Sequence, residues 1–253
     1  MQRPGHSAIE IIAHRGAGQS NLQPDTPPEN TLPAFAWAWS PEVSADAAEL
    51  DIHLTKDGEI VVIHDDTTDR TTNARLVVQE HTLAELRSLD AGSWKAPQFA
   101  GIRLPTLVEA MEIIPEGKRL FTEIKTGPRM VDRLAEVVRS SGKPAAQLPL
   151  ISFNIDAIRR AKEKLPEHEC YLLASPECDG LDALIQLVKR AGLDGIDAGF
   201  PMPCGLLERI HDHHLKTVVW TVNDVEAARK MIEAGVHSIT TDFPRQLRAA
   251  LTG

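Results

Sequence analysis

Eight short runs of apolar and β-branched residues recur along the chain, and helical periodicity follows most of them. This alternation is typical of parallel βα units, because parallel strands need a long crossover connection that is usually a helix. Eight such units close naturally into a (β/α)8 TIM barrel, an α/β fold of roughly 250 residues. The chain has 253 residues, which matches that size. The predicted strands are Ile9–Ala13, Ala48–Ile52, Arg119–Ile124, Leu148–Ser152, Cys170–Leu173, Gly195–Asp197, Thr217–Thr221 and Ser238–Thr241.

Predicted helices fill most of the intervals between these strands. The proline-rich stretch Gln23–Pro28 forms a long loop before the first of them. Loops of this length in compact domains are commonly either functional or disordered. The predicted helices are Glu29–Trp39, Met130–Ser141, Ile155–Lys164, Leu181–Ala191, Leu206–His213 and Val225–Glu233.

The interval between the second and third strands is too long for a single crossover helix. It contains a strand-like run at Glu59–His64, a short segment at Thr82–Leu89 and a predicted helix at Thr106–Ile113. We therefore expect one barrel domain over residues 1–253, with a small insertion after the second strand at about residues 53–115.

Composition limits the partners of this chain. The net charge of −9 disfavours nucleic acid and anionic membranes as partners, and the 42% hydrophobic content is that of an ordinary soluble globular protein. The cysteines, Cys170, Cys178 and Cys204, are odd in number and lack the spacing of a zinc or redox motif. No apolar run reaches the roughly 18 residues of a membrane span. We predict a soluble cytoplasmic protein without stable membrane association, and the oligomeric state stays open.

Chemically active residues gather where the apolar runs end. In a barrel of parallel strands the active site lies at the carboxyl ends of the strands, so these positions are the most informative. Glu49 and Asp51 are two residues apart in one strand, so their side chains project to the same side. Glu123 and Lys125 share this spacing. The candidate site residues are His14, Arg15, Glu49, Asp51, His64, Glu123, Lys125 and Trp220.

The residue types at this rim indicate a charged ligand. Three carboxylates that converge at one place repel one another unless a cation lies between them. Carboxylate oxygens favour Mg²⁺ or Ca²⁺ over Zn²⁺ as that cation. An arginine and a lysine beside the carboxylates indicate a phosphate or another anion.

The candidate residues belong to a longer series of motifs that spans almost the whole chain. The motifs are His14-Arg15-Gly16, Glu29-Asn30-Thr31, Glu49 to Gly58, Val62 to Asp65, Asp69 to Thr72, Leu104 to Leu107, Glu123 to Lys125, Ser152-Phe153, Trp220 to Asn223 and Thr241 to Pro244. In these motifs the sequence resembles the glycerophosphodiester phosphodiesterase family, of the compact bacterial cytosolic type. The segment from Ala17 to Pro28 departs from the resemblance, because it is longer and richer in proline than the family pattern implies.

The resemblance implies a role for each candidate residue. It implies a TIM barrel whose insertion bears the second catalytic histidine, and a divalent cation, Mg²⁺ or Ca²⁺, as the cofactor. The implied roles are metal ligation by Glu49, Asp51 and Glu123, acid–base catalysis by His14 and His64, and phosphate contacts by Arg15 and Lys125.

The implied reaction is hydrolysis of a glycerophosphodiester, such as glycerophosphocholine or glycerophosphoethanolamine, to sn-glycerol 3-phosphate and an alcohol. The substrate's 2-hydroxyl would attack the phosphate and give a cyclic phosphate that water then opens, while direct attack by water stays an alternative. The resemblance assigns His14 as the first base.

Three residues in or beside the recognised motifs allow more than one interpretation. Trp220 would either pack against the glycerol or cap the barrel. His53 lies two residues beyond Asp51, where a supporting role is expected rather than metal ligation. Glu29 would either cap a helix start or order the site.

Two other functions compete with this prediction. A related barrel phosphodiesterase that acts on phosphoinositides or sphingolipids would release a cyclic phosphate, but the membrane-docking elements that it normally needs are not evident. A non-catalytic phosphate-binding barrel would have no need of both His14 and His64, because binding alone requires no acid–base pair.

Overall fold

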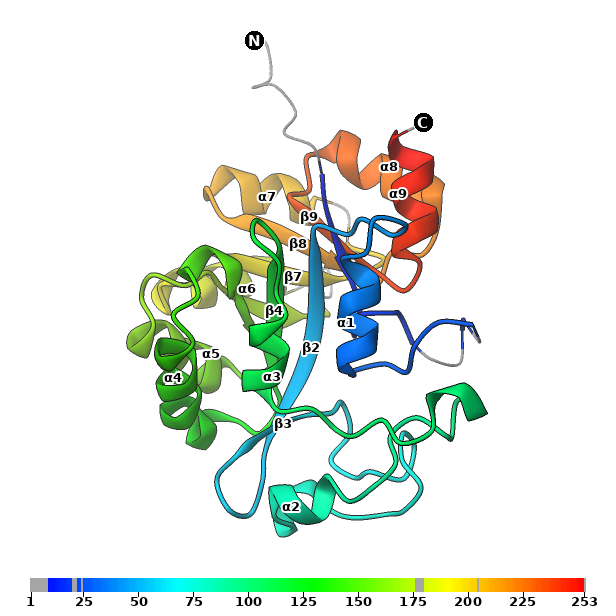
Figure 1. The fold of residues 1–253 in the computed structure, drawn as a ribbon. Helices are drawn as coiled ribbons and strands as arrows, with labels where there is room; N and C mark the ends of the chain where they lie inside the picture. Colours follow the sequence, from blue (N-terminus) through cyan, green and yellow to red (C-terminus); the bar gives the residue numbers. More distant parts are fainter. Residues whose placement is uncertain (1–8, 20–21, 24, 176–179, 204, 253) are drawn as a thin grey trace.

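Eight parallel strands form a closed barrel in the structure (Figure 1), a computed structural model that describes residues 9–19, 22–23, 25–175, 180–203 and 205–252. The strand order is β1-β9-β8-β7-β6-β5-β4-β2, and a parallel pairing between β1 and β2 closes the ring. The predicted (β/α)8 barrel is thereby confirmed. The barrel strands are β1 (Glu10–Ala13), β2 (Ala47–Leu54), β4 (Arg119–Ile124), β5 (Leu150–Ser152), β6 (Cys170–Ala174), β7 (Gly195–Gly199), β8 (Lys216–Trp220) and β9 (Ser238–Thr241).

Helices surround the barrel and begin where the sequence offers a cap. The side chains of Asn154 and Asp224 accept hydrogen bonds from backbone N–H groups in the first turns of α5 and α8. Such caps satisfy N–H groups that have no partner within the helix. The helices around the barrel are α1 (Leu32–Ala38), α3 (Leu107–Glu112), α4 (Val131–Ser140), α5 (Ile155–Lys164), α6 (Leu181–Arg190), α7 (Leu206–Asp212), α8 (Val225–Ala234) and α9 (Pro244–Thr252).

Two helices differ from the prediction. Helix α1 begins at Leu32 rather than at Glu29, because Thr31 is the residue that caps it by accepting from the backbone N–H of Ala34. Glu29 therefore has its carboxylate available for other contacts. Helix α9 follows the last strand, outside the intervals in which helices were predicted, and buries Leu247.

The insertion lies between β2 and α3 and has its own small core. Strand β3 (Ile60–Val62) pairs antiparallel with the end of β2, and the short helix α2 (Leu83–Leu86) follows. Thr82 and Glu85 form a capping box that fixes the start of α2. The core of the insertion consists of Val61, Ile63, Val78, Leu86, Ala91 and Leu104.

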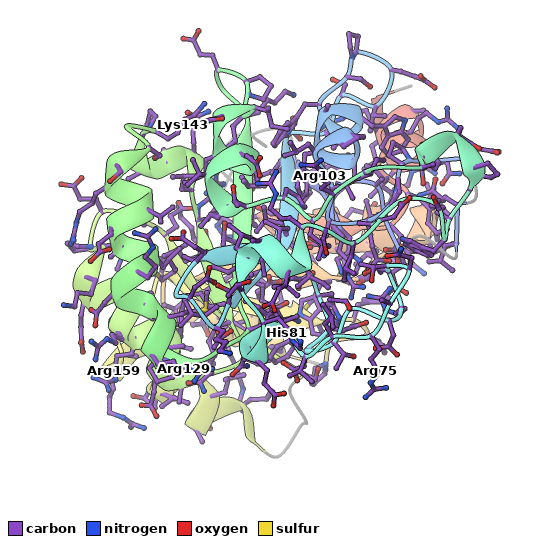
Figure 2. The ribbon with its side chains drawn as sticks, turned by 60° about the horizontal axis from the view of Figure 1, so that its bottom comes forward. Arg75, His81, Arg103, Arg129, Lys143 and Arg159 are labelled. Atoms are coloured by element: carbon purple, nitrogen blue, oxygen red, sulfur yellow. The ribbon has the colours of Figure 1, made fainter. Side chains whose placement is uncertain are left out.

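The hairpin of β2 and β3 carries His64 back to the carboxyl end of the barrel. The backbone N–H of Ile63 donates to the carbonyl of Asp51 at 3.0 Å, which places His64 beside the polar end of β2. Figure 2 looks toward this end of the molecule, where the insertion that bears Arg75, His81 and Arg103 lies in front of the barrel strands. The insertion therefore places His64 and its loop at the carboxyl end of the barrel, beside the ends of the strands.

The barrel interior is apolar in its middle and closed by ion pairs at the amino ends of the strands. There, the Arg119 guanidinium bridges the carboxylates of Glu10 and Glu169. The apolar residues that fill the interior above these ion pairs are Ile12, Ala47, Phe121, Ile151, Tyr171, Leu173 and Val218.

Candidate functional site

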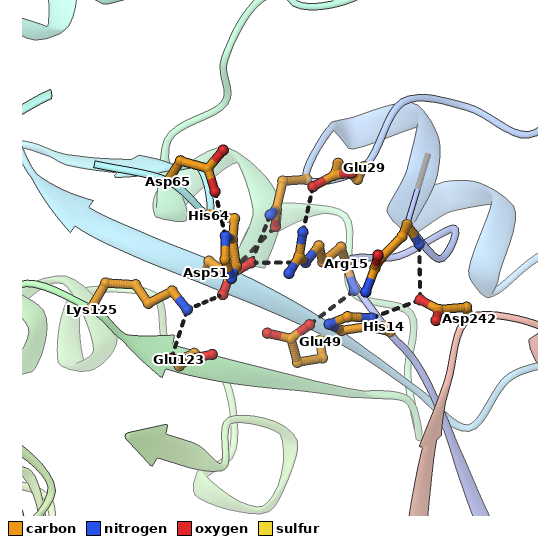
Figure 3. A network of polar contacts seen from close by, with 12 residues as sticks. His14, Arg15, Glu29, Glu49, Asp51, His64, Asp65, Glu123, Lys125 and Asp242 are labelled. Carbon is orange, nitrogen blue, oxygen red and sulfur yellow. Dashed lines mark hydrogen bonds and ion pairs between the residues drawn. The ribbon is translucent and has the colours of Figure 1, made fainter. Parts of the chain in front are cut away.

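Three carboxylates lie together at the carboxyl end of the barrel. Glu49 and Asp51 project inward from β2, and the strand register sets Asp51 directly beside Glu123 of β4. One oxygen of each lies within 4.8 Å of the others, and all three side chains are buried (Figure 3). The two-residue spacing of Glu49 and Asp51 and the pairing of β2 with β4 thus bring the three predicted metal ligands together.

The electrostatics of this cluster fit a bound cation. Burial, and then the charges of Asp51 and Glu123, raise the pKa of Glu49 well above its usual value. Burial and the charge of Asp51 raise the pKa of Glu123 to about 7. Burial would also raise the pKa of Asp51, but nearby positive charges, Lys125 first, hold it well below its usual value. The ionised forms of Glu49 and Glu123 therefore need further positive charge, which a divalent ion with a preference for oxygen ligands supplies.

Lys125 and Arg15 approach the carboxylates from two sides. The Lys125 Nζ lies 2.8 Å from Glu123 and 3.2 Å from Asp51. The backbone N–H of Arg15 donates to Glu49 at 2.9 Å, and its Nη1 donates to Glu29 at 2.7 Å. The buried Nε of Arg15 has no hydrogen-bond partner among the described residues. This Nε lies 3.7 Å from Oδ2 of Asp51 as an ion pair, too far for a hydrogen bond, so its N–H and the Lys125 ammonium form a setting in which an anion can bind.

His14 is held by an aspartate from the other end of the chain. Its Nδ1 lies 2.7 Å from Asp242, which follows β9, and Asp242 also accepts from the Asn223 side chain at 2.8 Å and from the Gln19 backbone at 2.9 Å. Burial would raise the pKa of Asp242, but its hydrogen bonds and the charge of His14, with the His14 hydrogen bond first among them, together keep this pKa below its usual value. An ionised Asp242 at Nδ1 leaves Nε2 as the nitrogen of His14 that can serve a ligand.

His64 has an equivalent partner in its own loop. Its Nδ1 lies 2.6 Å from Asp65, and Asp65 in turn accepts from Arg70 Nε at 2.5 Å. Arg70 also donates to Glu29 at 2.8 Å, so the second histidine is linked to the carboxylate that binds Arg15. Burial lowers the pKa of His64 below its usual value. The site therefore contains two histidine–aspartate pairs, one from the barrel and one from the insertion.

These residues surround a cavity of about 210 Å³. The charged side of the cavity is formed by β1, β2 and β4, and the other side is largely apolar, with Trp220 and Phe153 in edge-to-face contact at 5.5 Å. A second cavity, lined by Trp94 and Arg70, shares Arg15, Gln19 and His64 with the first. Asp51 does not line the first cavity but forms an ion pair with Lys125, which does. The other sequence-predicted site residues all line this cavity: His14, Arg15, Glu49, His64, Glu123, Lys125 and Trp220.

Several residues of the site have partners that the sequence did not reveal. Asn30 donates from its side chain to Asp51 at 2.8 Å and accepts from the Asp51 backbone N–H at 3.2 Å. The His53 Nε2 lies 3.1 Å from the carbonyl of His64, so His53 supports that loop. Asp242, Asp65, Arg70 and Asn30 all stand in motifs that the sequence analysis recognised, but nothing in their spacing reveals their partners.

The proline-rich loop joins the barrel to the insertion. The Gln23 side chain donates to the carbonyl of Asp242, and the Lys95 ammonium of the insertion donates to Thr26 Oγ1 at 3.0 Å. Residues 20–21 and 24 of this loop lie outside the described residues, as do Cys178 and Cys204, whereas Cys170 is buried with a free thiol. The described part of the loop thus contacts the carboxylate partner of His14.

Comparisons with known proteins agree on one family. A family model described as the glycerophosphoryl diester phosphodiesterase family matches residues 14–246. The chain is 36% identical over 242 residues to a glycerophosphodiester phosphodiesterase of Caldanaerobacter subterraneus, covering 94% of this chain and 95% of that protein. It is 40% identical over 260 residues to a probable glycerophosphodiester phosphodiesterase 1 of Mycobacterium tuberculosis, covering 95% and 92%.

The solved structures give the same result. A phosphodiesterase of Oleispira antarctica in complex with the product sn-glycerol-3-phosphate matches with a TM-score of 0.85 at 28% identity, covering 96% of this chain and 97% of that one. A putative glycerophosphoryl diester phosphodiesterase of Silicibacter pomeroyi matches with a TM-score of 0.83 at 27% identity, covering 98% and 95%. The likeness extends over the whole barrel and its insertion.

Proposed function

Because the chain belongs to the glycerophosphoryl diester phosphodiesterase family, we propose that it hydrolyses glycerophosphodiesters such as glycerophosphocholine and glycerophosphoethanolamine to sn-glycerol 3-phosphate and an alcohol. The observation that carries the proposal is the pair of histidines, each held through Nδ1 by an aspartate, beside a buried cluster of three carboxylates. A site that only binds phosphate has no need of two oriented proton carriers. The product in the Oleispira antarctica complex is consistent with this choice.

Glu49, Asp51 and Glu123 would hold the divalent cation, Mg²⁺ or Ca²⁺. When bound, the cation neutralises charge on the phosphate and on the oxygens that become more negative in the transition state. Lys125 would keep its hydrogen bond to Glu123 and its ion pair with Asp51 and would present a remaining proton to the phosphate. The Nε of Arg15, which has no hydrogen-bond partner among the described residues, would donate to a second phosphate oxygen.

The two histidines would move the protons. His14 Nε2 would take the proton of the substrate's 2-hydroxyl as that oxygen forms a bond to phosphorus, and His64 would give a proton to the alcohol oxygen as its bond to phosphorus breaks. Water would then open the cyclic phosphate with the two roles reversed. Asp242 and Asp65 would fix each ring in the tautomer that leaves Nε2 toward the substrate and would stabilise the imidazolium.

We further propose that the chain acts as one barrel domain over residues 1–253, in the cytoplasm, without nucleic acid or a stable membrane partner. The support is its net charge of −9 and its one described cysteine, Cys170, which is a free thiol. Among the described residues, no helix has both the length and the apolar character that crossing a bilayer requires.

The test is incubation of the purified protein with glycerophosphocholine, glycerophosphoethanolamine and glycerophosphoinositol, with a coupled assay for released glycerol 3-phosphate. Release that stops with a chelator and returns with Mg²⁺ or Ca²⁺ would support the proposal. A cyclic phosphate as the only product would instead favour the phosphoinositide- or sphingolipid-type reaction. Binding of the substrates with no product of either kind would contradict an enzymatic function.

A further inference from the structure

Asp197 is a buried carboxyl group that the mechanism above leaves unused. It lies in the middle of β7, its side chain points into the barrel, and only 2% of the residue is exposed to solvent. It lines the same cavity as His14, Glu49 and Glu123. Its Oδ1 is buried and has no hydrogen-bond partner among the described residues. Such a group is costly to the fold, so a functional reason for its presence is needed.

The barrel order places Asp197 far from the positive groups of the site. In the closed ring of eight strands, β7 stands opposite β2, which carries Glu49 and Asp51. On its own side, the register sets Asp197 between Leu173 of β6 and Val218 of β8. The acidic side chain is therefore flanked by apolar residues on both neighbouring strands, and no described cation pairs with it.

The surroundings of Asp197 favour a neutral hydroxyl as its ligand. Burial, and then the like charge of Glu123, raise its pKa well above the usual value, so the site disfavours an isolated charge there. A carboxyl group can exchange hydrogen bonds with a hydroxyl in either protonation state. The neighbouring Phe153 and Trp220 offer apolar surfaces that suit a short carbon chain leading to that hydroxyl.

We propose that Asp197 is a specificity-determining residue that hydrogen-bonds the terminal C1 hydroxyl of the substrate's glycerol. This inference rests on the proposed function and adds the group by which the enzyme recognises glycerol. The phosphate lies with Arg15 and Lys125, and the 2-hydroxyl must reach His14, so the C1 hydroxyl is the polar group of glycerol that extends farthest from the phosphorus. The apolar wall opposite the charged strands is where that end of the molecule would lie.

The test compares two substrates in two variants. The substrates are glycerophosphocholine and its 1-deoxy analogue, 2-hydroxypropyl phosphocholine, which keeps the attacking hydroxyl and lacks the C1 hydroxyl. The variants are Asp197→Leu, which removes both carboxyl oxygens, and Asp197→Asn, which keeps a hydrogen-bonding group of the same shape. The matched control is Thr217→Val, because Thr217 is also a buried barrel residue with an unpartnered side-chain oxygen, but it does not line the cavity.

We expect the wild type to prefer glycerophosphocholine over the deoxy analogue by about 100-fold in kcat/KM, since the analogue leaves one buried carboxyl group without its hydrogen-bond partner. Asp197→Leu should lose most of this preference, through a higher KM for glycerophosphocholine and little change for the analogue. Asp197→Asn should keep part of the preference, and Thr217→Val should keep all of it.

A thermal melt separates recognition from a structural role. Asp197→Leu removes a buried, unpartnered carboxyl group, so its melting temperature should equal or exceed that of the wild type. A lower melting temperature with an equal loss on both substrates would overturn the inference. A wild type that fails to distinguish the two substrates would also overturn it, while release of glycerol 3-phosphate would still support the proposed function. A wild type that releases no glycerol 3-phosphate would refute the proposed function itself.

Discussion

The two ends of the barrel both contain clustered charged side chains, but only the amino-terminal end balances them internally. There, Arg119 donates to both oxygens of Glu10 at 2.9 Å, and Ser238 donates to the same carboxylate at 2.6 Å. Glu169 accepts from Arg119, Lys216 and the Tyr171 hydroxyl. Burial would raise the pKa of Glu169, but these partners, Lys216 first, lower it to about 2.

The carboxyl-terminal end is arranged in the opposite way. Three buried carboxylates share one lysine and part of one arginine, and the pKa values of Glu49 and Glu123 are raised rather than lowered. The cluster is stable as ionised groups only when further positive charge arrives. At the amino-terminal end of the barrel, charged side chains pair with one another and stabilise the fold. At the carboxyl-terminal end, the negative charges exceed their positive partners within the protein, so they can bind a ligand.

The largest expected effect is the loss of turnover on substitution of a histidine at the carboxyl-terminal end of the barrel. Substituting His64→Ala should reduce kcat/KM for glycerophosphodiesters by about 10²- to 10⁴-fold, because one of two proton transfers loses its carrier. The melting temperature of the His64→Ala variant should stay near that of the wild type. The control is His213→Ala, because His213 directly follows α7 and its ring contacts Lys189 away from the cavity. Near-normal turnover of His64→Ala would remove this residue from the mechanism.

The amino-terminal end should respond in stability and not in activity. Arg119→Met leaves the carboxylates of Glu10 and Glu169 without their shared partner and should cost about 3 kcal/mol of unfolding free energy. Urea denaturation measures this loss, and kcat/KM at 25 °C should match the wild type. The control Arg133→Met removes an ion pair with Glu59 in which both side chains are about 40% exposed, and it should cost under about 1 kcal/mol. If Arg119→Met lost activity before stability, the division of roles between the two ends would be wrong.

If the carboxylates of Glu49, Asp51 and Glu123 bind a cation as proposed, the stability of the protein should depend on cation concentration through this end of the barrel only. In chelated wild-type protein, a divalent cation at about 100 times its Kd should add about 2.7 kcal/mol of stability, or roughly 5 to 10 °C in melting temperature. Glu123→Gln removes one of the three repelling carboxylates, so the chelated variant should melt higher than chelated wild type and should gain little from Mg²⁺ or Ca²⁺. Differential scanning fluorimetry measures both effects without an activity assay. An equal cation response in the two proteins would contradict the assignment of Glu123 as a ligand.

The barrel itself could be predicted from the sequence because its signals are local. Each strand is a short apolar run, and the observed strands lie within one or two residues of those predicted, as β4 and β9 illustrate. Helix α9 was not predicted, because helices were expected only as connections between two strands and no strand follows β9. Glu29 was expected near a helix start, but the capping residue is Thr31, because a hydroxyl two residues later reaches the free N–H group.

The site could be predicted only as far as the strand ends allow. Topology brings the ends of parallel strands together, so Glu49, Asp51 and Glu123 were found by position alone. The pairing of His14 with Asp242 joins residues 228 positions apart and depends on how β1 meets β9 when the barrel closes. Asp197 ends the predicted strand Gly195–Asp197, but a single aspartate at a strand end does not reveal whether its side chain is buried or paired.

The smallest expected effect is a difference in acid sensitivity that arises at the amino-terminal end. The pKa of Glu169 falls from 4.5 to about 2 on folding, so the folded state binds its proton less readily than the unfolded state does. The stability from this group is therefore fully present above about pH 4.5 and is lost as the pH falls toward 2. Urea denaturation between pH 7 and pH 3 should show a shallower decline in Glu169→Gln than in the wild type, although the variant is less stable at pH 7. Glu116→Gln, which removes an exposed carboxylate outside this network, should follow the wild-type curve. Parallel curves for Glu169→Gln and the wild type would mean that the balanced charges at this end contribute nothing to acid sensitivity.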